Sequence, residues 1–225
     1  MRHLLHLCWL LVAMVNVPAA EAATLRYLAL GDSYTIGEGV AAEGRWPEQL
    51  AVALRREGVD IAPPRIIATT GWTTDELSAA MDAAEPLGSW DLVSLLIGVN
   101  NQYRGRPVAD FRAEFERMLG RAVSLAGAPG RVFVLNIPDW GITPFAEGRD
   151  RAAIAGELDA YNAAMAELCA KHGVALVDIA AVYRAQGRDA AMLVDDGLHP
   201  SARMYAAWVE AALPTLRALL VDASR

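Results

Sequence analysis

The sequence predicts a three-layer α/β/α protein: a flavodoxin-like parallel sheet of five strands with helices on both faces. Three observations lead to this fold class. Short apolar segments typical of buried strands alternate with segments that show helical spacing of apolar residues. Glycine or asparagine stands near the carboxyl end of most of the apolar segments, as expected at strand exits. No internal repeat, linker or low-complexity segment divides the chain, so we expect a single domain over 23–225.

Five segments are predicted as strands because each is short, rich in Leu, Val and Ile, and bounded by turn residues. The segment 91–97 is the clearest, since almost all of its residues are apolar. A continuous apolar run of this length is typical of a strand that is covered on both faces. The five segments are 24–30, 65–69, 91–97, 131–136 and 174–179.

Helices are predicted between the strands from their end signals. Pro47 lies at the start of one helix and Gly58 ends it, whereas Thr73 and Glu76 form a capping box for the next. Pro214 is expected to kink or interrupt the last helix, because proline lacks the backbone N–H. The remaining predicted helices cover 107–126, 150–171 and a segment that begins at Ser201.

The first 22 residues are predicted to be a signal peptide. Arg2 is followed by an almost wholly apolar run over 4–17, and Ala20-Glu21-Ala22 has the small-x-small pattern of a cleavage site. The run is short for a membrane span, so we expect cleavage after Ala22 rather than an uncleaved anchor. The mature chain would then be periplasmic or secreted, with no membrane-spanning segment.

Composition narrows the possible partners. The formal net charge is −7 without a basic run, which argues against nucleic acid or an anionic membrane surface as a partner. After cleavage the chain keeps one cysteine, Cys169, and two histidines, His172 and His199. No intramolecular disulfide can form, and this set does not make a metal site, so no metal or other cofactor is expected.

Asp196 and His199 are the first candidates for chemistry. An Asp three residues ahead of a His in a tight Gly- and Pro-containing turn can place its carboxylate behind the imidazole. The imidazole could then take a proton from a hydroxyl, which alone is a poor nucleophile at neutral pH. Ser33 follows the first predicted strand, where ligands sit in open α/β sheets, and completes a Ser-His-Asp triad.

Four sequence blocks resemble the SGNH or GDSL-type hydrolase family. They are Gly-Asp-Ser at 31–33, the Gly71 turn, Gly-Val-Asn-Asn at 98–101 and Asp-Gly-Leu-His at 196–199. They occur in the family's order and span nearly the whole mature chain. Each block alone is a weak signal, but four blocks on four strand-exit loops form a specific pattern.

The resemblance implies a role for each residue. Ser33 would be the nucleophile, His199 its base, and Asp196 the residue that orients the imidazole. The N–H groups of Ser33 and Gly71 and the side-chain amide of Asn100 would form the oxyanion hole. One position departs from the family pattern, because Asn101 stands where the family usually has Asp.

Several nearby residues have competing interpretations. Asp195 could replace Asp196 as the triad acid, but only Asp196 has the family spacing; Asp32 is expected to support its loop rather than react. His172 and Cys169 are expected to be structural helix residues. Taken singly, the serine, histidine, asparagine and glycine could also be ordinary turn or cap residues. Five aromatic residues near the strand exits could line an acyl or alcohol pocket or pack in the core: Tyr34, Trp46, Trp72, Tyr103 and Trp140.

The expected function is hydrolysis of carboxylic esters through an acyl-enzyme intermediate, by an esterase that could be lysophospholipase-like. The substrate would be a small-molecule, lipid or carbohydrate ester. A carbohydrate O-deacetylase of the same mechanism is the first alternative, because the fold does not select the substrate. A non-catalytic carbohydrate- or lipid-binding protein on the same scaffold is the second.

Overall fold

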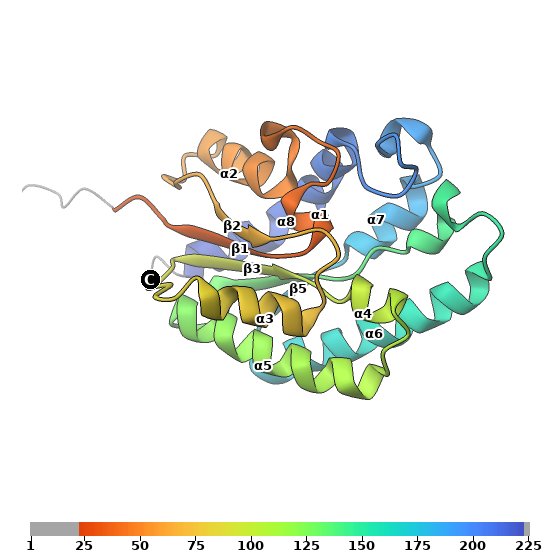
Figure 1. Ribbon diagram of the computed structural model, residues 1–225. Helices are drawn as coiled ribbons and strands as arrows, with labels where there is room; N and C mark the ends of the chain where they lie inside the picture. The colour runs from red at the N-terminus through yellow and green to blue at the C-terminus, as the bar shows by residue number, and fades with distance from the viewer. Residues whose placement is uncertain (1–22, 223–225) are drawn as a thin grey trace, which may run out of the picture.

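The structure, a computed structural model, describes residues 23–222, so the predicted signal peptide lies outside the described residues. A parallel sheet of five strands in the order β2-β1-β3-β4-β5 lies between two layers of helices (Figure 1). This arrangement confirms the predicted three-layer, flavodoxin-like fold. The strands are β1 (Tyr27–Gly31), β2 (Arg65–Ala68), β3 (Leu92–Leu96), β4 (Val132–Leu135) and β5 (Ala175–Val177).

The three central strands carry the core. Every residue of β1, β3 and β4 is buried, whereas the edge strands β2 and β5 begin with residues that are partly exposed. In the centre, Leu28 of β1 pairs in register with Val93 of β3. Continuous apolar strands are stable here because helices cover both faces of the sheet.

The helices form two layers (Figure 1). The helices α2, α7 and α8 pack together on one face, and α3, α5 and α6 pack together on the other. Trp46 and Trp208 are the largest fully buried side chains of the first layer, and Phe111 and Phe115 are among those of the second. The long helices are α2 (Trp46–Arg56), α3 (Thr74–Ala83), α5 (Val108–Ala126), α6 (Arg151–His172), α7 (Ile179–Gln186) and α8 (Ala202–Asp222).

Three helices were not predicted: α1 (Ser33–Ile36), α4 (Val99–Tyr103) and α7. The first two have only four and five residues, too few to show an apolar periodicity. They begin directly after the segments of β1 and β3, and each carries a residue of the predicted site. α7 begins after Asp178, whose side chain accepts a hydrogen bond from the N–H of Ala181.

Of the two expected effects of Pro214, a kink or an interruption, the interruption does not occur, because α8 continues through this residue. Proline removes a hydrogen bond to the carbonyl four residues earlier, here that of Glu210. Glu210 is exposed, so water can satisfy the released carbonyl group. Buried Trp208 and Leu216 on either side hold the helix to the sheet by packing.

The segment 137–148 contains two prolines and two glycines, which predicts an ordered surface loop, but it is only partly at the surface. It forms two short 3-10 turns, Trp140–Ile142 and Pro144–Ala146, and the side chain of Trp140 is buried. Asn162 on α6 anchors its start, since its side-chain amide accepts from the N–H of Ile137 at 2.8 Å and donates to the carbonyl of Ile137 at 2.9 Å. Two hydrogen bonds to Asn162 therefore tie the start of this segment to α6, beside the edge of the sheet.

Within residues 23–222, one helix has the length and apolar composition to cross a membrane: α8 over Ala202–Val221, with a mean hydropathy of 1.2. A core helix of a globular fold meets the same criterion. In this fold α8 packs against α2 and α7.

Candidate active site

Ser33 lies at the carboxyl end of β1, where the chain turns into α1. Gly31 makes the turn possible, because a Cβ atom at this position would lie 2.5 Å from the carbonyl oxygen of Leu96 on β3. Asp32 caps α1, and its Oδ1 accepts a hydrogen bond from the N–H of Tyr34 at 3.0 Å. Ser33 is therefore the first residue of the helix, and its side chain is largely buried.

Asp32 supports its loop, as its position predicts, and the pKa of its carboxyl group is raised. Its side chain is fully buried, and this burial raises its pKa to about 7, although hydrogen bonds from backbone N–H groups act in the opposite direction. One carboxyl oxygen, Oδ2, has no hydrogen-bond partner among the described residues. The carboxyl group is thus poorly suited to carry a charge.

Asp196 and His199 meet within one tight turn. Oδ2 of Asp196 lies 2.5 Å from Nδ1 of His199, and Oδ1 accepts from the backbone N–H groups of Leu198 at 2.8 Å and His199 at 2.9 Å. Gly197 takes a positive φ of 67° that allows the chain to reverse. The turn is closed by a hydrogen bond of 2.9 Å from the N–H of Val194 to the carbonyl of His199.

The electrostatics of this pair favour a carboxylate. Burial of Asp196 would raise its pKa, but the hydrogen bonds from the His199 ring and from the two backbone N–H groups outweigh this effect and hold the pKa below its usual range. His199 is bonded to Asp196 rather than to the competing Asp195. A charged carboxylate on Nδ1 leaves Nε2 as the ring atom that can exchange a proton with another group.

Gly71, in the loop after β2, and Asn100, in the short helix α4, lie at the same edge of the sheet. Gly71 has a positive φ of 88°, which only glycine adopts readily. Asn100 lies in the first turn of α4, and its Nδ2 donates to the carbonyl of Trp72 at 2.8 Å. This bond uses one of the two amide hydrogens, so the other can serve a ligand.

A cavity of about 180 Å³ joins these residues. Ser33, Gly71, Asn100 and His199 all line it, whereas Asp196 does not and contacts His199 from outside the cavity. The structure therefore brings four of the five predicted site residues to one cavity and the fifth into contact with His199. The other lining residues are Tyr34, Thr70, Val99, Tyr103, Trp140, Phe145 and Leu198.

Aromatic side chains form one part of the cavity wall. Tyr103, Trp140 and Phe145 form a cluster, with ring centroids 5.5 Å apart for Tyr103 and Trp140 and 6.0 Å apart for Trp140 and Phe145. The guanidinium of Arg149 lies over all three rings, at 5.2 to 5.3 Å from their centroids. Tyr103 and Phe145 are also among the exposed large apolar side chains, so they lie where the cavity meets solvent.

Three of the five aromatic residues singled out in the sequence line the cavity: Tyr34, Tyr103 and Trp140. Trp46 belongs to the core, where it packs edge-on against a ring of β4, and Trp72 packs against the core without lining the cavity. Phe145 was missed, because its place depends on how the segment 137–148 folds back. Leu198 was not identified from the sequence as a cavity residue either, although its position next to His199 indicates that it lies near the site.

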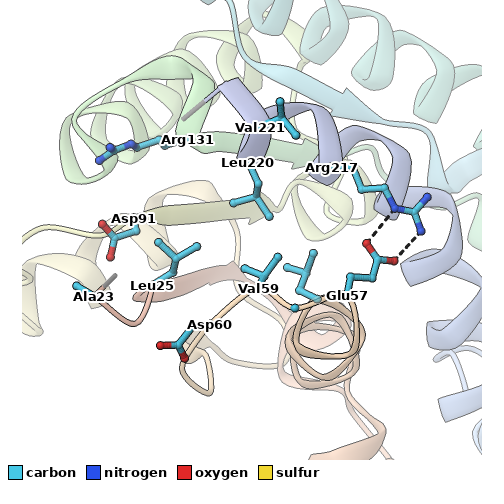
Figure 2. A pocket seen from close by; sticks show the side chains of 12 residues that line it. Ala23, Leu25, Glu57, Val59, Asp60, Asp91, Arg131, Arg217, Leu220 and Val221 are labelled. Atoms are coloured by element: carbon cyan, nitrogen blue, oxygen red, sulfur yellow. Dashed lines mark hydrogen bonds and ion pairs between the residues drawn. The ribbon is translucent and has the colours of Figure 1, made fainter. Parts of the chain in front are cut away.

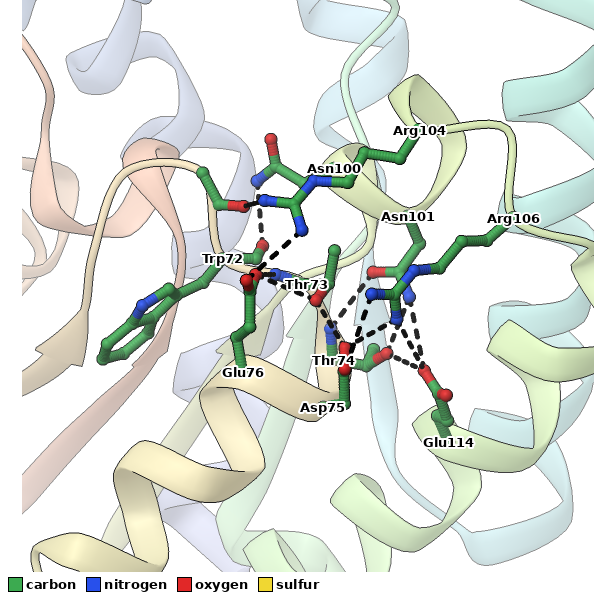
Figure 3. A network of polar contacts seen from close by, with 11 residues as sticks. Trp72, Thr73, Thr74, Asp75, Glu76, Asn100, Asn101, Arg104, Arg106 and Glu114 are labelled. Carbon is green, nitrogen blue, oxygen red and sulfur yellow. Dashed lines mark hydrogen bonds and ion pairs between the residues drawn. The ribbon is translucent and has the colours of Figure 1, made fainter.

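Asn101, the departure from the family pattern, is fully buried and has structural contacts only among the described residues. Its Oδ1 accepts from the N–H of Thr74 at 3.1 Å, and its Nδ2 donates to the Thr74 hydroxyl at 2.7 Å and to Glu114 at 3.3 Å (Figure 3). The hydroxyl of Thr74 in turn donates to Glu114. The amide thus ties α4 to the start of α3, and Glu114 on α5 supplies a carboxylate in the same network.

His172 and Cys169 have the structural environments expected for them. His172, at the end of α6, lies 2.9 Å from the carboxylate of Glu116. Cys169 is buried, and burial raises the pKa of its thiol to about 12. Among residues 23–222, no cluster of three or more His, Cys, Asp or Glu side chains is arranged to hold a metal ion.

A larger cavity of about 490 Å³ lies elsewhere (Figure 2). Its wall combines Leu25, which precedes β1, with the end of α2 and the end of α8, and the ion pair between Glu57 and Arg217 borders it at 2.6 Å. Among the residues that the structure describes, no serine, cysteine or histidine lines it, so these residues offer no nucleophile–base pair. The smaller cavity is therefore the candidate active site despite its size.

Fold and site define a class: a three-layer α/β/α protein whose candidate site lies at the carboxyl edge of a parallel sheet. The chain belongs to the GDSL-like lipase/acylhydrolase family, whose family model matches residues 29–207. This result confirms the resemblance seen in the four sequence blocks. No match was found among the curated proteins that were compared.

Solved structures show the same fold. The crystal structure of TesA is similar with a TM-score of 0.68 at 22% sequence identity, over 86% of this chain and 99% of that chain. The psychrotrophic esterase EstA from a Pseudoalteromonas species, inhibited by monoethylphosphonate, gives a TM-score of 0.67 at 17% identity, over 87% of this chain and 98% of that one. Phospholipase A1 from Streptomyces albidoflavus NA297 gives 0.62 at 24% identity, over 87% and 99%.

Proposed function

We propose that this protein is an exported hydrolase of carboxylic esters that uses Ser33 as nucleophile, His199 as general base and Asp196 as the residue that orients the imidazole. The observation that carries the proposal is the shared cavity of Ser33 and His199, with Asp196 bonded to the far nitrogen of the ring at 2.5 Å. Membership of the GDSL-like lipase/acylhydrolase family supports hydrolysis of esters as the reaction class.

The mechanism follows from the contact of Asp196 with Nδ1 of His199, which leaves Nε2 to exchange protons. Nε2 of His199 takes the hydroxyl proton of Ser33 as the oxygen attacks the ester carbonyl, and a tetrahedral oxyanion forms. The N–H groups of Ser33 and Gly71 and the free amide hydrogen of Asn100 donate to that oxyanion; one donor of this kind lowers the barrier by about 3 kcal/mol. His199 then protonates the leaving alcohol. Water activated by His199 attacks the acyl-enzyme, the bond to the Ser33 oxygen breaks, and the carboxylic acid is released while Ser33 regains its proton.

The cavity wall favours an apolar group on the substrate. Tyr103, Trp140 and Phe145 surround the space beside Ser33, and a cavity of about 180 Å³ suits a short acyl chain or a small aromatic alcohol better than a long chain. Among the similar structures are an esterase and a phospholipase A1, which is consistent with an ester carrying an apolar acyl group. Carbohydrate deacetylation, the alternative, has less support, since Tyr103, Trp140 and Phe145 give the cavity an apolar aromatic face.

The test is hydrolysis of p-nitrophenyl acetate, butyrate and octanoate by the wild type and by Ser33→Ala. We expect turnover by the wild type, fastest with the two short esters, and a loss of kcat of at least about 10³-fold in the variant. Retained turnover by Ser33→Ala would remove Ser33 as nucleophile. Absence of turnover on all esters and on acetylated sugars would favour a binding protein instead.

Export is part of the proposal and rests on the sequence of residues 1–22. The expected mature chain begins at Ala23. N-terminal sequencing of the protein recovered from outside the cytoplasm checks this, and a chain that still begins at Met1 would contradict it.

A further inference from the structure

We propose that Arg104 is a positioning residue that fixes the Gly71 donor of the oxyanion hole, an inference that rests on the proposed function. Arg104 directly follows α4, and its Nη2 donates to the carbonyl oxygen of Gly71 at 2.7 Å (Figure 3). It does not line the cavity and so would act through Gly71 rather than on the substrate.

The helix α4 makes three separate contacts with the Gly71 loop. Asn100 donates to the carbonyl of Trp72 at 2.8 Å, Asn101 bonds the N–H and hydroxyl of Thr74, and Arg104 bonds Gly71. Residues 100 and 101 each share a helix face with residue 104, because positions three and four apart lie on the same side of a helix. One short helix thus carries one proposed oxyanion donor, Asn100, and holds the loop that carries another.

The Gly71 loop needs such an anchor. Thr69 to Trp72 form a turn in which the N–H of Trp72 donates to the carbonyl of Thr69 at 3.3 Å, and Gly71 is its third residue with a φ of 88°. A positive φ at this position is the mark of a type II turn. Type I and type II turns differ by a flip of the central peptide, here the one that carries the Gly71 N–H.

Few atoms pack beside the Cα atom of Gly71. A Cβ atom added to Gly71 would have only one neighbour within 4 Å, Nη2 of Arg104 at 3.9 Å, so the glycine lies in open space. Glycine adopts both signs of φ with similar ease. Hydrogen bonds therefore fix the peptide on its two sides: the Thr70 hydroxyl donates to Glu38 before it, and Arg104 bonds the Gly71 carbonyl after it.

Arg106 is the matched control. It lies two residues further along the chain and pairs with Asp75 at 2.6 Å and Glu114 at 3.8 Å, but no hydrogen bond joins it to Gly71. Arg104 has an acidic partner too, Glu76 at 3.3 Å, so both side chains are arginines in ion pairs with the first turn of α3. The feature that separates them is the bond to the Gly71 carbonyl.

The kinetic test compares Arg104→Met with Arg106→Met on p-nitrophenyl butyrate. Arg104→Met should lower kcat on the order of 10-fold to 100-fold and change KM less than about twofold, because a misplaced donor weakens binding of the transition state only. The affinity for a boronic acid that forms a tetrahedral serine adduct should fall by a similar factor. Arg104→Lys, which keeps a donor, should recover part of kcat, and Arg106→Met should resemble the wild type.

A second readout does not depend on turnover. In ¹⁵N–¹H spectra of the wild type and both variants, the Gly71 amide resonance should shift or broaden in Arg104→Met and stay in place in Arg106→Met. Equal loss of kcat in the two variants, or an unchanged kcat and Gly71 resonance in Arg104→Met, would overturn the inference. If the wild type hydrolyses no ester, the proposed function fails, while the Gly71 resonance still decides whether Arg104 holds this peptide.

Discussion

The bond between Asp196 and His199 determines which nitrogen of the imidazole carries the proton. A carboxylate at 2.5 Å from Nδ1 holds the proton there and leaves Nε2 as the ring atom that accepts the Ser33 proton in the proposed mechanism. The low pKa of Asp196 keeps this arrangement in place, because the carboxylate stays charged at neutral pH.

Asp196→Asn should therefore lower kcat by about 10²- to 10⁴-fold while the fold is retained. The amide can still accept the backbone bonds of Leu198 and His199 through its oxygen, but its NH₂ group faces Nδ1 and favours the wrong tautomer. Steady-state kinetics together with circular dichroism check this prediction. The matched control is Asp195→Asn, which should leave kcat within about threefold of the wild type; a large loss there would reassign the triad acid.

Asp32 should make stability depend on pH. Its pKa is raised from 3.8 to about 7 by burial, so the folded protein holds a proton that the unfolded chain has lost between these values. The free energy of unfolding should then fall as the pH rises from 5 to 8, by roughly 1–4 kcal/mol from this group. Well below the unfolded pKa of 3.8 both states are protonated, and the effect disappears.

Urea unfolding of the wild type and Asp32→Asn at pH 5 and pH 8 measures this contribution. Between pH 5 and pH 8 the free energy of unfolding should fall less in Asp32→Asn than in the wild type. The variant should therefore become more stable relative to the wild type as the pH rises. An identical pH dependence in both proteins would show that the buried carboxyl group does not titrate in this range.

At the scale of elements, the passage from β1 into α1 depends on the absence of a side chain at Gly31. β1 and β3 are adjacent central strands, and a Cβ atom at this position would meet the Leu96 carbonyl of β3 and the side chain of Thr35 in α1. Neither the central strand nor the helix can move without disturbing Ser33.

Gly31→Ala should destabilise the fold by about 1–3 kcal/mol through overpacking and also lower ester turnover, since Ser33 lies two residues later. Gly120→Ala is the control: Gly120 lies on the exposed side of α5 with no atom within 4 Å of an added Cβ, and alanine there should stabilise by about 0.5–1 kcal/mol. Thermal and urea unfolding check both. A neutral Gly31→Ala would contradict the close approach of the two strands.

The sequence predicted all five strands and every long helix except α7, because their apolar patterns and end signals are local. It did not predict α1 or α4, whose few residues show no periodicity, nor the continuity of α8 through Pro214, which depends on packing at Trp208 and Leu216. The same limit applies to Phe145. Its place beside the cavity depends on how a whole segment folds back across the sheet edge.

At the scale of the molecule, the sheet order explains how distant residues meet. β1 has β2 on one side and β3 on the other, so the chain reverses its direction of winding between β1 and β3. Ligands bind at such a switch point, outside the carboxyl ends of the strands. Ser33 and Asn100 leave the sheet there, and Gly71 follows β2. The alternating pattern of the sequence was sufficient to predict this meeting, whereas the anchoring of Gly71 by Arg104 required the structure.

The central claim is that Ser33 is a nucleophile activated by His199. Treatment with a serine-directed organophosphonate, followed by peptide mass mapping of the wild type, Ser33→Ala and His199→Ala, tests it most directly. The account predicts one modified residue, Ser33, in the wild type, no modification in Ser33→Ala, and a rate of modification lowered by at least about 10²-fold in His199→Ala. Modification at another residue, or an unchanged rate without His199, would contradict it.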